Sequence, residues 1–196
     1  MAGARKQAID RYLWRSERGL FEDFDFIKGR SSGYPYLTTY YPLWAGVASA
    51  AQAASVRNAL PIFERGGGLS MDNRPSGAQW DDPFGWAPTN WLAVCGLEVY
   101  GFRGDAERVA EKFTATIDRS YAADGTIREK YNMALGNADV QVTAGYTENV
   151  VGFGWTNGVY LKLRELLSAE FSGGSCAPRQ AGTAATAIHR SGCATL

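Results

Sequence analysis

The chain has 196 residues, of which 45% are hydrophobic and 20% charged, a composition typical of one ordinary globular domain. Its 20 basic and 20 acidic residues cancel, so neither nucleic acid nor an anionic membrane is expected as a partner. No run of 18 apolar residues occurs, and no transmembrane helix is expected. The N-terminal segment lacks the apolar core of a signal peptide and resembles the inside of a helix, so we expect the chain to begin part-way through a domain and leave its localisation open.

Histidine and cysteine are scarce, which narrows the possible chemistry. The single histidine is His189, and no CxxC pair or mixed Cys/His cluster indicates a metal site among the three cysteines. We therefore expect no metal and no cofactor. If the chain belongs to an enzyme, carboxylates are its natural proton carriers.

Apolar spacing predicts helices in six segments of the chain. Three segments are apolar nearly all round, which is typical of helices covered on every side. The other three carry apolar residues on one face only. The apolar segments are 40–50, 86–101 and 156–170, and the amphipathic ones are 5–18, 52–60 and 105–121.

The two kinds of helix alternate along the chain. An apolar inner helix followed by an amphipathic outer helix is the repeating unit of an α/α toroid, so the predicted fold class is all-α with little or no sheet. Each apolar helix opens on an aromatic residue with Pro, Thr or Asn, as in YYPLWAG, GWAPTNW and GWTNGV. The loops that enter the inner helices would gather at one end of the ring and form a pocket there. Segment 19–26, GLFEDFDF, is the exception and predicts a short strand or an extended arm.

The chain changes character near its end. Residues 172–196 are rich in Gly, Ala, Ser and Thr without any period, which predicts a disordered low-complexity tail. The folded domain is therefore expected to occupy residues 1–171.

The loop QWDDPFGWAP, residues 79–88, places two tryptophans beside two adjacent aspartates. Such a mixture fits a loop that lines a ligand pocket. The loop is similar to the QWDxPxGWAP signature of the trehalases, the inverting glycosidases that split α,α-trehalose into two glucoses. GFGWTNGV at 152–159 resembles the closing motif of that family, and EKY at 129–131 resembles the segment that supplies its catalytic base.

The resemblance runs from about residue 5 to residue 167 and includes PLWAG at 42–46. The trehalase fold is an (α/α)6 barrel larger than this chain, so the chain resembles the C-terminal half of the barrel. The family's PGGRF-type segment and its GWDxSxRW-like segment, which carries the catalytic acid, have no counterpart here. We therefore expect the isolated chain to be inactive and to need the missing N-terminal half as its partner.

The resemblance implies that Glu129 is the general base of an inverting hydrolysis. Glu129 lies between Arg128 and Lys130, and neighbouring positive charge favours an ionised carboxylate. The alternative for such a residue is a solvated glutamate in a charged loop.

The same resemblance assigns substrate contacts to the loop at 79–88. Trp80 and Trp86 would pack on a sugar ring, while Gln79 and Asp81 would orient hydroxyl groups or hold neighbouring loops. The alternative is that both tryptophans are packing residues and that Asp81 caps the helix that follows. Glu148, in TAGYTENVV, is nearest in type to the sugar-binding glutamate of the family's GGGGEY segment, although it aligns with it only through a gap.

Three functional interpretations follow. The first is a trehalase-like glycoside hydrolase fragment, which hydrolyses trehalose with inversion when the full domain is present. The second is a related α/α-toroid α-glucosidase of another specificity. The third is a non-catalytic carbohydrate-binding remnant.

Overall fold

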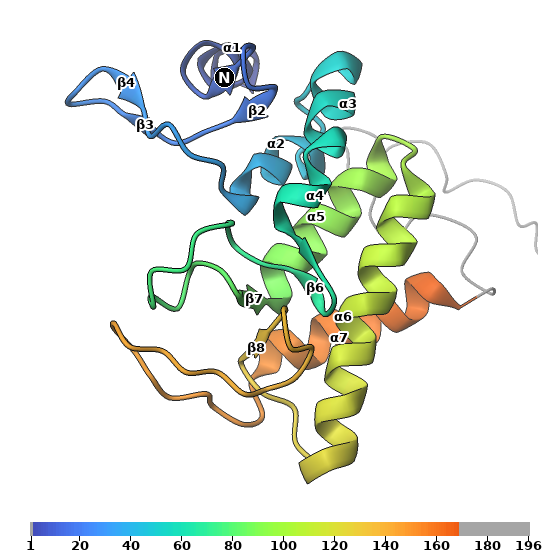
Figure 1. Cartoon of the computed structure of the whole chain (residues 1–196). Helices are drawn as coiled ribbons and strands as arrows, with labels where there is room; N and C mark the ends of the chain where they lie inside the picture. Colours follow the sequence, from blue (N-terminus) through green and yellow to red (C-terminus); the bar gives the residue numbers. More distant parts are fainter. Residues whose placement is uncertain (1, 169–196) are drawn as a thin grey trace, which may run out of the picture.

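The computed structural model describes residues 2–168, and the tail predicted at 172–196 lies outside the described residues. The described part is mainly helical, with short strands that pair into four two-stranded sheets (Figure 1). A 3-10 helix, Leu37–Tyr40, leads into the second α-helix. The α-helices are α1 (Ala2–Tyr12), α2 (Tyr41–Trp44), α3 (Ala50–Asn58), α4 (Leu60–Phe63), α5 (Ala87–Val99), α6 (Arg103–Asp124) and α7 (Gly154–Leu167).

All four sheets are antiparallel pairs of two- or three-residue strands. Each sheet joins two consecutive strands. In three sheets the strands are a few residues apart, whereas in the fourth they lie more than forty residues apart. The pairs are β1 (Trp14–Arg15) with β2 (Leu20–Phe21), β3 (Phe24–Asp25) with β4 (Arg30–Ser31), β5 (Glu64–Arg65) with β6 (Gly68–Leu69), and β7 (Phe84–Trp86) with β8 (Lys130–Asn132).

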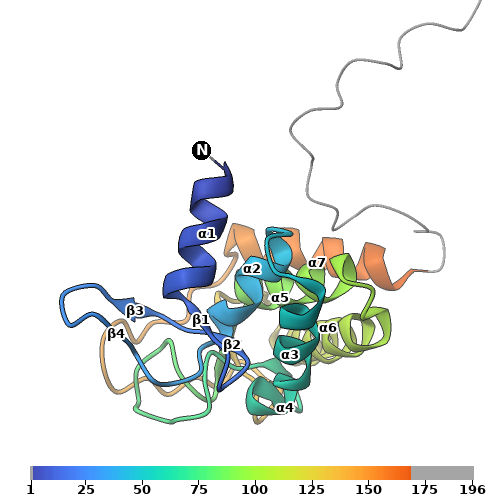
Figure 2. The ribbon, with the colours of Figure 1, turned by 90° about the horizontal axis from the view of Figure 1, so that it is seen from above.

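Helix α5 is the centre of the core and packs against α2, α6 and α7 (Figures 1 and 2). Its predicted apolar character is confirmed, because residues on several of its faces are buried. Gly96 lets α2 approach closely. A Cβ at Gly96 would stand 3.0 Å from Trp44 N and 3.1 Å from Tyr40 O, both backbone atoms.

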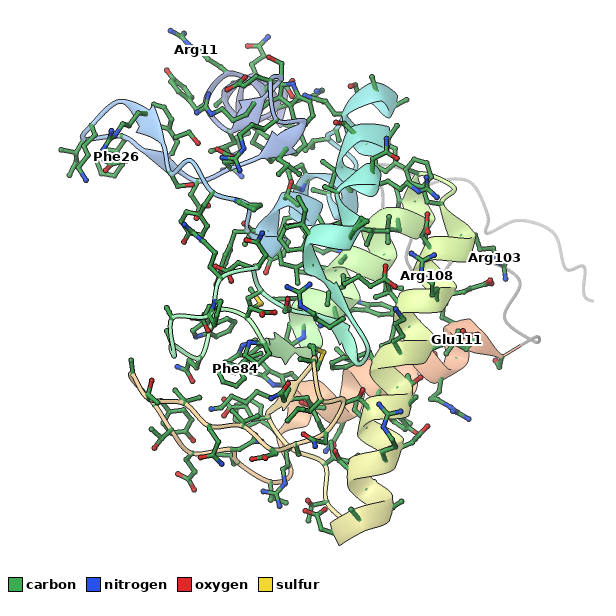
Figure 3. The ribbon with its side chains drawn as sticks, in the orientation of Figure 1. Arg11, Phe26, Phe84, Arg103, Arg108 and Glu111 are labelled. Carbon is green, nitrogen blue, oxygen red and sulfur yellow. The ribbon has the colours of Figure 1, made fainter. Side chains whose placement is uncertain are left out.

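Helix α6 has one buried face and one exposed face, as predicted. Val109, Phe113 and Ile117 are buried at spacings of four, while Arg103 and Glu111 project from the outer side of the helix (Figure 3). The helix ends where Gly125 adopts a left-handed conformation with φ 70°, the usual helix C-terminus.

Two predicted helices are shorter than expected. The helix expected at 5–18 ends at Tyr12, because the chain turns at Gly19, with φ 66°, and folds back as the β1–β2 hairpin. The helix expected at 40–50 is reduced to α2, which ends just before Gly46, with φ 65°, and Ser49 then begins the next helix. Ser49 Oγ accepts a hydrogen bond from Gln52 N, and Gln52 Oε1 accepts one from Ser49 N, which forms a capping box.

The expectation of little or no sheet holds only in part, since each strand is two or three residues long. Such strands are too short to show an alternation of apolar and polar residues in the sequence. The strand predicted within 19–26 is present as β2 and β3.

Helix α1 projects from the rest of the molecule (Figure 2), and none of its residues is buried.

Candidate active site

The β7–β8 pair brings together two segments that the sequence separates by more than forty residues. Trp86 lies opposite Lys130, and Gly85 lies opposite Tyr131. The loop that precedes β7 and the loop that follows β8 project to the same side of the helices (Figures 1 and 2). The tryptophan loop and the EKY segment therefore form one structural unit.

Glu129 directly precedes β8 and is 7% exposed. Its backbone N–H donates a hydrogen bond of 2.9 Å to Val150 O, and its carbonyl accepts one of 3.4 Å from Thr156 Oγ1 in the first turn of α7. The backbone of Glu129 is thus held between a loop and a helix start. Burial and these contacts exclude the alternative in which Glu129 is a solvated loop residue.

Lys130 is fully buried, with 0% exposure. Its Nζ donates hydrogen bonds to Glu148 O at 2.6 Å and to Gln79 Oε1 at 3.3 Å, and it lies 3.4 Å from Glu129 Oε2. It also lies 5.3 Å from the centroid of the Trp86 ring. Sequence reasoning identified Lys130 only as a positive neighbour of Glu129 and missed these contacts.

Trp80 and Trp86 stack flat, with ring centroids 3.9 Å apart and planes 4° apart. Trp86 is 2% exposed, and its Nε1 donates a hydrogen bond of 3.0 Å to Gln79 O. Trp80 is 41% exposed. Trp86 therefore lies beneath Trp80, and of the two rings only Trp80 offers a substantial open surface.

Asp81 braces its own loop. Its Oδ2 accepts hydrogen bonds from the backbone N–H of Ser76, at 2.6 Å, and from the Ser76 hydroxyl. Its Oδ1 is buried without a hydrogen-bond partner. The suggested capping role is wrong, because the N-cap of α5 is Trp86 and no side chain caps that helix.

Trp80 and Asp81 line a cavity of about 530 Å³, within the size range of small-molecule sites. Burial raises the pKa of the Tyr36 hydroxyl well above its usual range, so Tyr36 stays neutral and donates a hydrogen bond of 2.7 Å to Trp80 O. The guanidinium of Arg74 lies 3.8 Å above the Tyr34 ring. The lining consists of aromatic and polar residues: Tyr34, Tyr36, Asp72, Arg74, Ser76, Ala78, Trp80 and Asp81.

Glu148 lies in the loop after β8, and its side chain is exposed. Its neighbour Asn149 was not singled out from the sequence, yet it clamps β8. Asn149 Oδ1 accepts from Lys130 N at 3.2 Å, and its Nδ2 donates to Lys130 O at 3.0 Å. An asparagine in an irregular loop carries no sequence signal for such a role.

Within residues 2–168, no cluster of three or more His, Cys, Asp or Glu side chains is arranged to hold a metal ion. None of the helices in the described part combines the length and apolar character that crossing a membrane requires.

Comparisons with known proteins place this geometry in a family context. A family model described as trehalase matches residues 1–168. The cytosolic neutral trehalase of Pyricularia oryzae is 38% identical over 184 residues, which cover 84% of this chain and 25% of that protein. The periplasmic trehalase of Xanthomonas campestris pv. campestris is 40% identical over 168 residues, which cover 85% of this chain and 29% of that protein.

Two kinds of solved structure are similar. The neutral trehalase of Saccharomyces cerevisiae superposes with a TM-score of 0.71 at 34% identity, over 87% of this chain and 30% of that one. A GH63 mannosylglycerate hydrolase of Thermus thermophilus in complex with glucose superposes with a TM-score of 0.65 at 20% identity, over 81% of this chain and 37% of that one, which shows a likeness of fold alone. The chain spans between a quarter and a third of the curated trehalases described above.

Proposed function

Because the chain belongs to the trehalase family, we propose that it contributes the base side of an active site that hydrolyses α,α-trehalose to glucose with inversion. Its helices would form the C-terminal half of an (α/α)6 toroid. The observation that carries this proposal is the β7–β8 pair, which joins the segment of Glu129 to the loop of Trp80.

Inverting hydrolysis needs two carboxyl groups about 6.5–9.5 Å apart, one to protonate the leaving oxygen and one to take a proton from the attacking water. Glu129 is proposed as the second group. Its buried carboxylate lies 3.4 Å from the ammonium of Lys130, so a cation of the same site faces the carboxylate. The catalytic acid would come from the remainder of the toroid.

Trp80 is proposed as the platform for a glucose ring. Sugar C–H faces pack on aromatic rings, and the half-exposed Trp80 borders the cavity of about 530 Å³. Trp86 would act from beneath by holding the Trp80 ring flat. Gln79 would orient a hydroxyl group, and Asp81 would act mainly by holding the loop through Ser76.

Glu148 is proposed as a further sugar contact from the loop after β8. Its exposed carboxylate is accessible to a hydroxyl group, while its carbonyl is held by Lys130. We expect Glu148 to contribute to binding rather than to turnover.

The missing part of the toroid is the proposed partner of the chain. The isolated chain would release no glucose from trehalose, and release would appear when the remainder is supplied. A suitable protein is a chimeric trehalase, in which residues 1–168 of this chain replace the aligned segment of the Pyricularia oryzae enzyme. Glucose release by the chain alone would contradict the proposed division of the site.

The decisive test is Glu129→Gln in this chimeric trehalase. A general base typically contributes 10²–10⁴-fold to the rate, so kcat should fall by about that factor, while KM stays within several-fold because the amide is nearly isosteric. Glu148→Gln serves as the comparison and should raise KM more than it lowers kcat. A Glu129→Gln chimera with near-parental turnover would refute the proposal.

A related α-glucosidase of other specificity is the second candidate function. A mannosylglycerate hydrolase has a similar fold, so the fold by itself does not specify which glycoside is hydrolysed. The chimeric trehalase should be assayed on a panel of α-glucosides beside trehalose. Residues 1–168 contribute the cavity lined by Trp80 and Asp81. A change in which α-glucoside the chimera prefers, relative to the parent enzyme, would therefore assign specificity to this segment. A non-catalytic carbohydrate-binding role predicts instead that the chimera binds trehalose without releasing glucose.

A further inference from the structure

Lys130 is an unusual residue for a protein interior. Its side chain is fully buried, and removing an ammonium group from water costs several kcal/mol unless nearby groups replace its hydration. Three oxygens do so, each from a different part of the chain: Glu148 O at 2.6 Å, Gln79 Oε1 at 3.3 Å and Glu129 Oε2 at 3.4 Å. The ammonium therefore joins both loops of the site to the carboxylate of Glu129.

Two aromatic rings complete the surroundings of the ammonium. Lys130 Nζ lies 5.3 Å from the centroid of the Trp86 ring and 4.4 Å from that of the Tyr146 ring. Both distances fall within the range of cation–π attraction. Trp86 in turn supports Trp80, so the same cation contacts the support of the proposed sugar platform.

The ammonium is not required to hold the two strands together. Strands β7 and β8 are already paired through their backbones, and Asn149 clamps the backbone of Lys130 from the other side. A buried ion pair is often no more stabilising than apolar residues of the same volume. The positions of the three oxygens then point to a role in arranging side chains.

The ammonium sets which atoms of its neighbours remain available. Lysine only donates hydrogen bonds, so the Gln79 oxygen must face Lys130, and its Nε2 is turned away. Likewise, Lys130 contacts Oε2 of Glu129. Within residues 2–168, neither Glu129 Oε1 nor Gln79 Nε2 makes a protein hydrogen bond. One acceptor and one donor are thereby left for water and substrate.

We propose that Lys130 is a positioning residue, whose ammonium orients the Glu129 carboxylate toward the attacking water and the Gln79 amide toward a sugar hydroxyl. The inference rests on the proposed function, since it takes Glu129 as the base. Lys130 itself neither gives nor takes a proton. It holds Oε2, so that Oε1 accepts the proton of the water.

The test is a double-mutant cycle in the chimeric trehalase, with Lys130→Met, Glu129→Gln and the double variant. A misplacement of about 1 Å can cost 10²-fold in rate, so Lys130→Met should lower kcat by about 10- to 100-fold and leave KM within about threefold. If Lys130 acts through Glu129, Lys130→Met should cost less than about twofold in the Glu129→Gln background. The matched control is Lys112→Met, which should keep parental kcat. Lys112 lies on α6, and its ammonium is 2.7 Å from Glu64 Oε1 in β5.

The outcomes separate this inference from the proposed function. Loss of turnover in Glu129→Gln, with parental kcat in Lys130→Met or independent losses in the double variant, would overturn the role of Lys130 and leave the base in place. Parental turnover in Glu129→Gln would instead refute the proposed function. Far-UV circular dichroism reports folding. If Lys130→Met does not fold, Lys130→Arg tests the inference instead. The retained cation should keep kcat within about tenfold of the parent. A folded Lys130→Arg variant with a larger loss of kcat would overturn the inference.

Discussion

Trp86 and Lys130 face each other across the β7–β8 pair, with the ammonium 5.3 Å from the centroid of the indole ring. This relationship joins the proposed sugar platform to the proposed base. Displacement of either strand would move Trp80, which stacks on Trp86, relative to Glu129, which adjoins Lys130. The geometry of the site therefore depends on how closely these strands pack on their neighbours.

Gly85 makes that close packing possible. A Cβ at this position would stand 2.5 Å from Met133 Cγ and 2.7 Å from Leu69 O. The methionine could move aside, but the backbone oxygen could not do so cheaply. Gly85→Ala should therefore lower the free energy of unfolding by about 1–3 kcal/mol, measured by urea denaturation of the 196-residue chain.

Gly104→Ala is the matched control for Gly85→Ala. Gly104 is the second residue of α6, and a Cβ added there would have no atom within 4 Å, so alanine should not lower the free energy of unfolding and should raise it by at most about 0.5 kcal/mol through helix propensity. Equal stability of the two variants would contradict the packing role of Gly85.

Substitution of Trp80 should weaken substrate binding, whereas substitution of Trp86 should lower the stability of the fold. In the chimeric trehalase, Trp80→Ala removes the open ring and should raise KM for trehalose by about tenfold, or about 1.4 kcal/mol. Trp86→Ala empties a buried site and should lower the free energy of unfolding of the chain by about 3–5 kcal/mol. Measurements of KM and urea unfolding on both variants check the division. A Trp80→Ala variant with unchanged KM would remove Trp80 from the substrate site.

The order of the main helices and the type of α5 and α6 could be predicted from sequence, because apolar spacing reports burial directly. The expectation that 156–170 is covered on every side was wrong, since only Thr156, Leu163 and Leu166 of α7 are buried. Helices α5 and α6 followed their patterns, since their buried faces extend over several turns. The ends of α1 and α2 did not, because a hairpin turn at Gly19 and the capping box of Ser49 override the local pattern.

The site could be predicted only as separate segments. The resemblance supplied Glu129 and the loop of Trp80, but not the backbone pairing that brings them together. The sequence could not show that Trp86 is buried and Trp80 half-exposed, because both are tryptophans within the same motif. The contacts of Lys130 join three segments, and no local sequence pattern encodes such a meeting point.

Burial of Lys130 can be checked on the chain itself by acetylation. Its ammonium is enclosed by three oxygens and two rings, whereas Lys28 and Lys162 are largely exposed. Brief treatment with an acetylating reagent should modify these two lysines at least about tenfold faster than Lys130, because a buried amine reacts only when the structure opens. Peptide mass spectrometry measures each rate. Equal rates under native conditions would contradict the enclosed position, and equal rates in urea serve as the control.

Glu64 should give the chain part of its pH-dependent stability. It lies at the start of β5 and receives hydrogen bonds from Arg108 Nε at 2.9 Å and from Lys112 Nζ at 2.7 Å, both on α6. The hydrogen bonds from Arg108, opposed by burial and aided by Lys112, hold the pKa of Glu64 below its usual value. The interactions of Glu64 with Arg108 and Lys112 therefore hold the β5–β6 hairpin against α6 most strongly while Glu64 is ionised.

The lowered pKa of Glu64 determines how its contribution to stability depends on pH. Unfolded glutamate titrates near about 4.3, so the stabilisation is fully present above that pH and is lost as the pH falls through the lower folded value. Glu64→Gln should reduce Tm at pH 6, and the difference from the parent should shrink toward pH 3. Glu111→Gln, on the exposed side of α6 (Figure 3), should leave Tm nearly unchanged at both pH values. A Tm difference for Glu64→Gln that stays constant from pH 6 to pH 3 would show that packing, and not the charge of Glu64, joins the hairpin to α6.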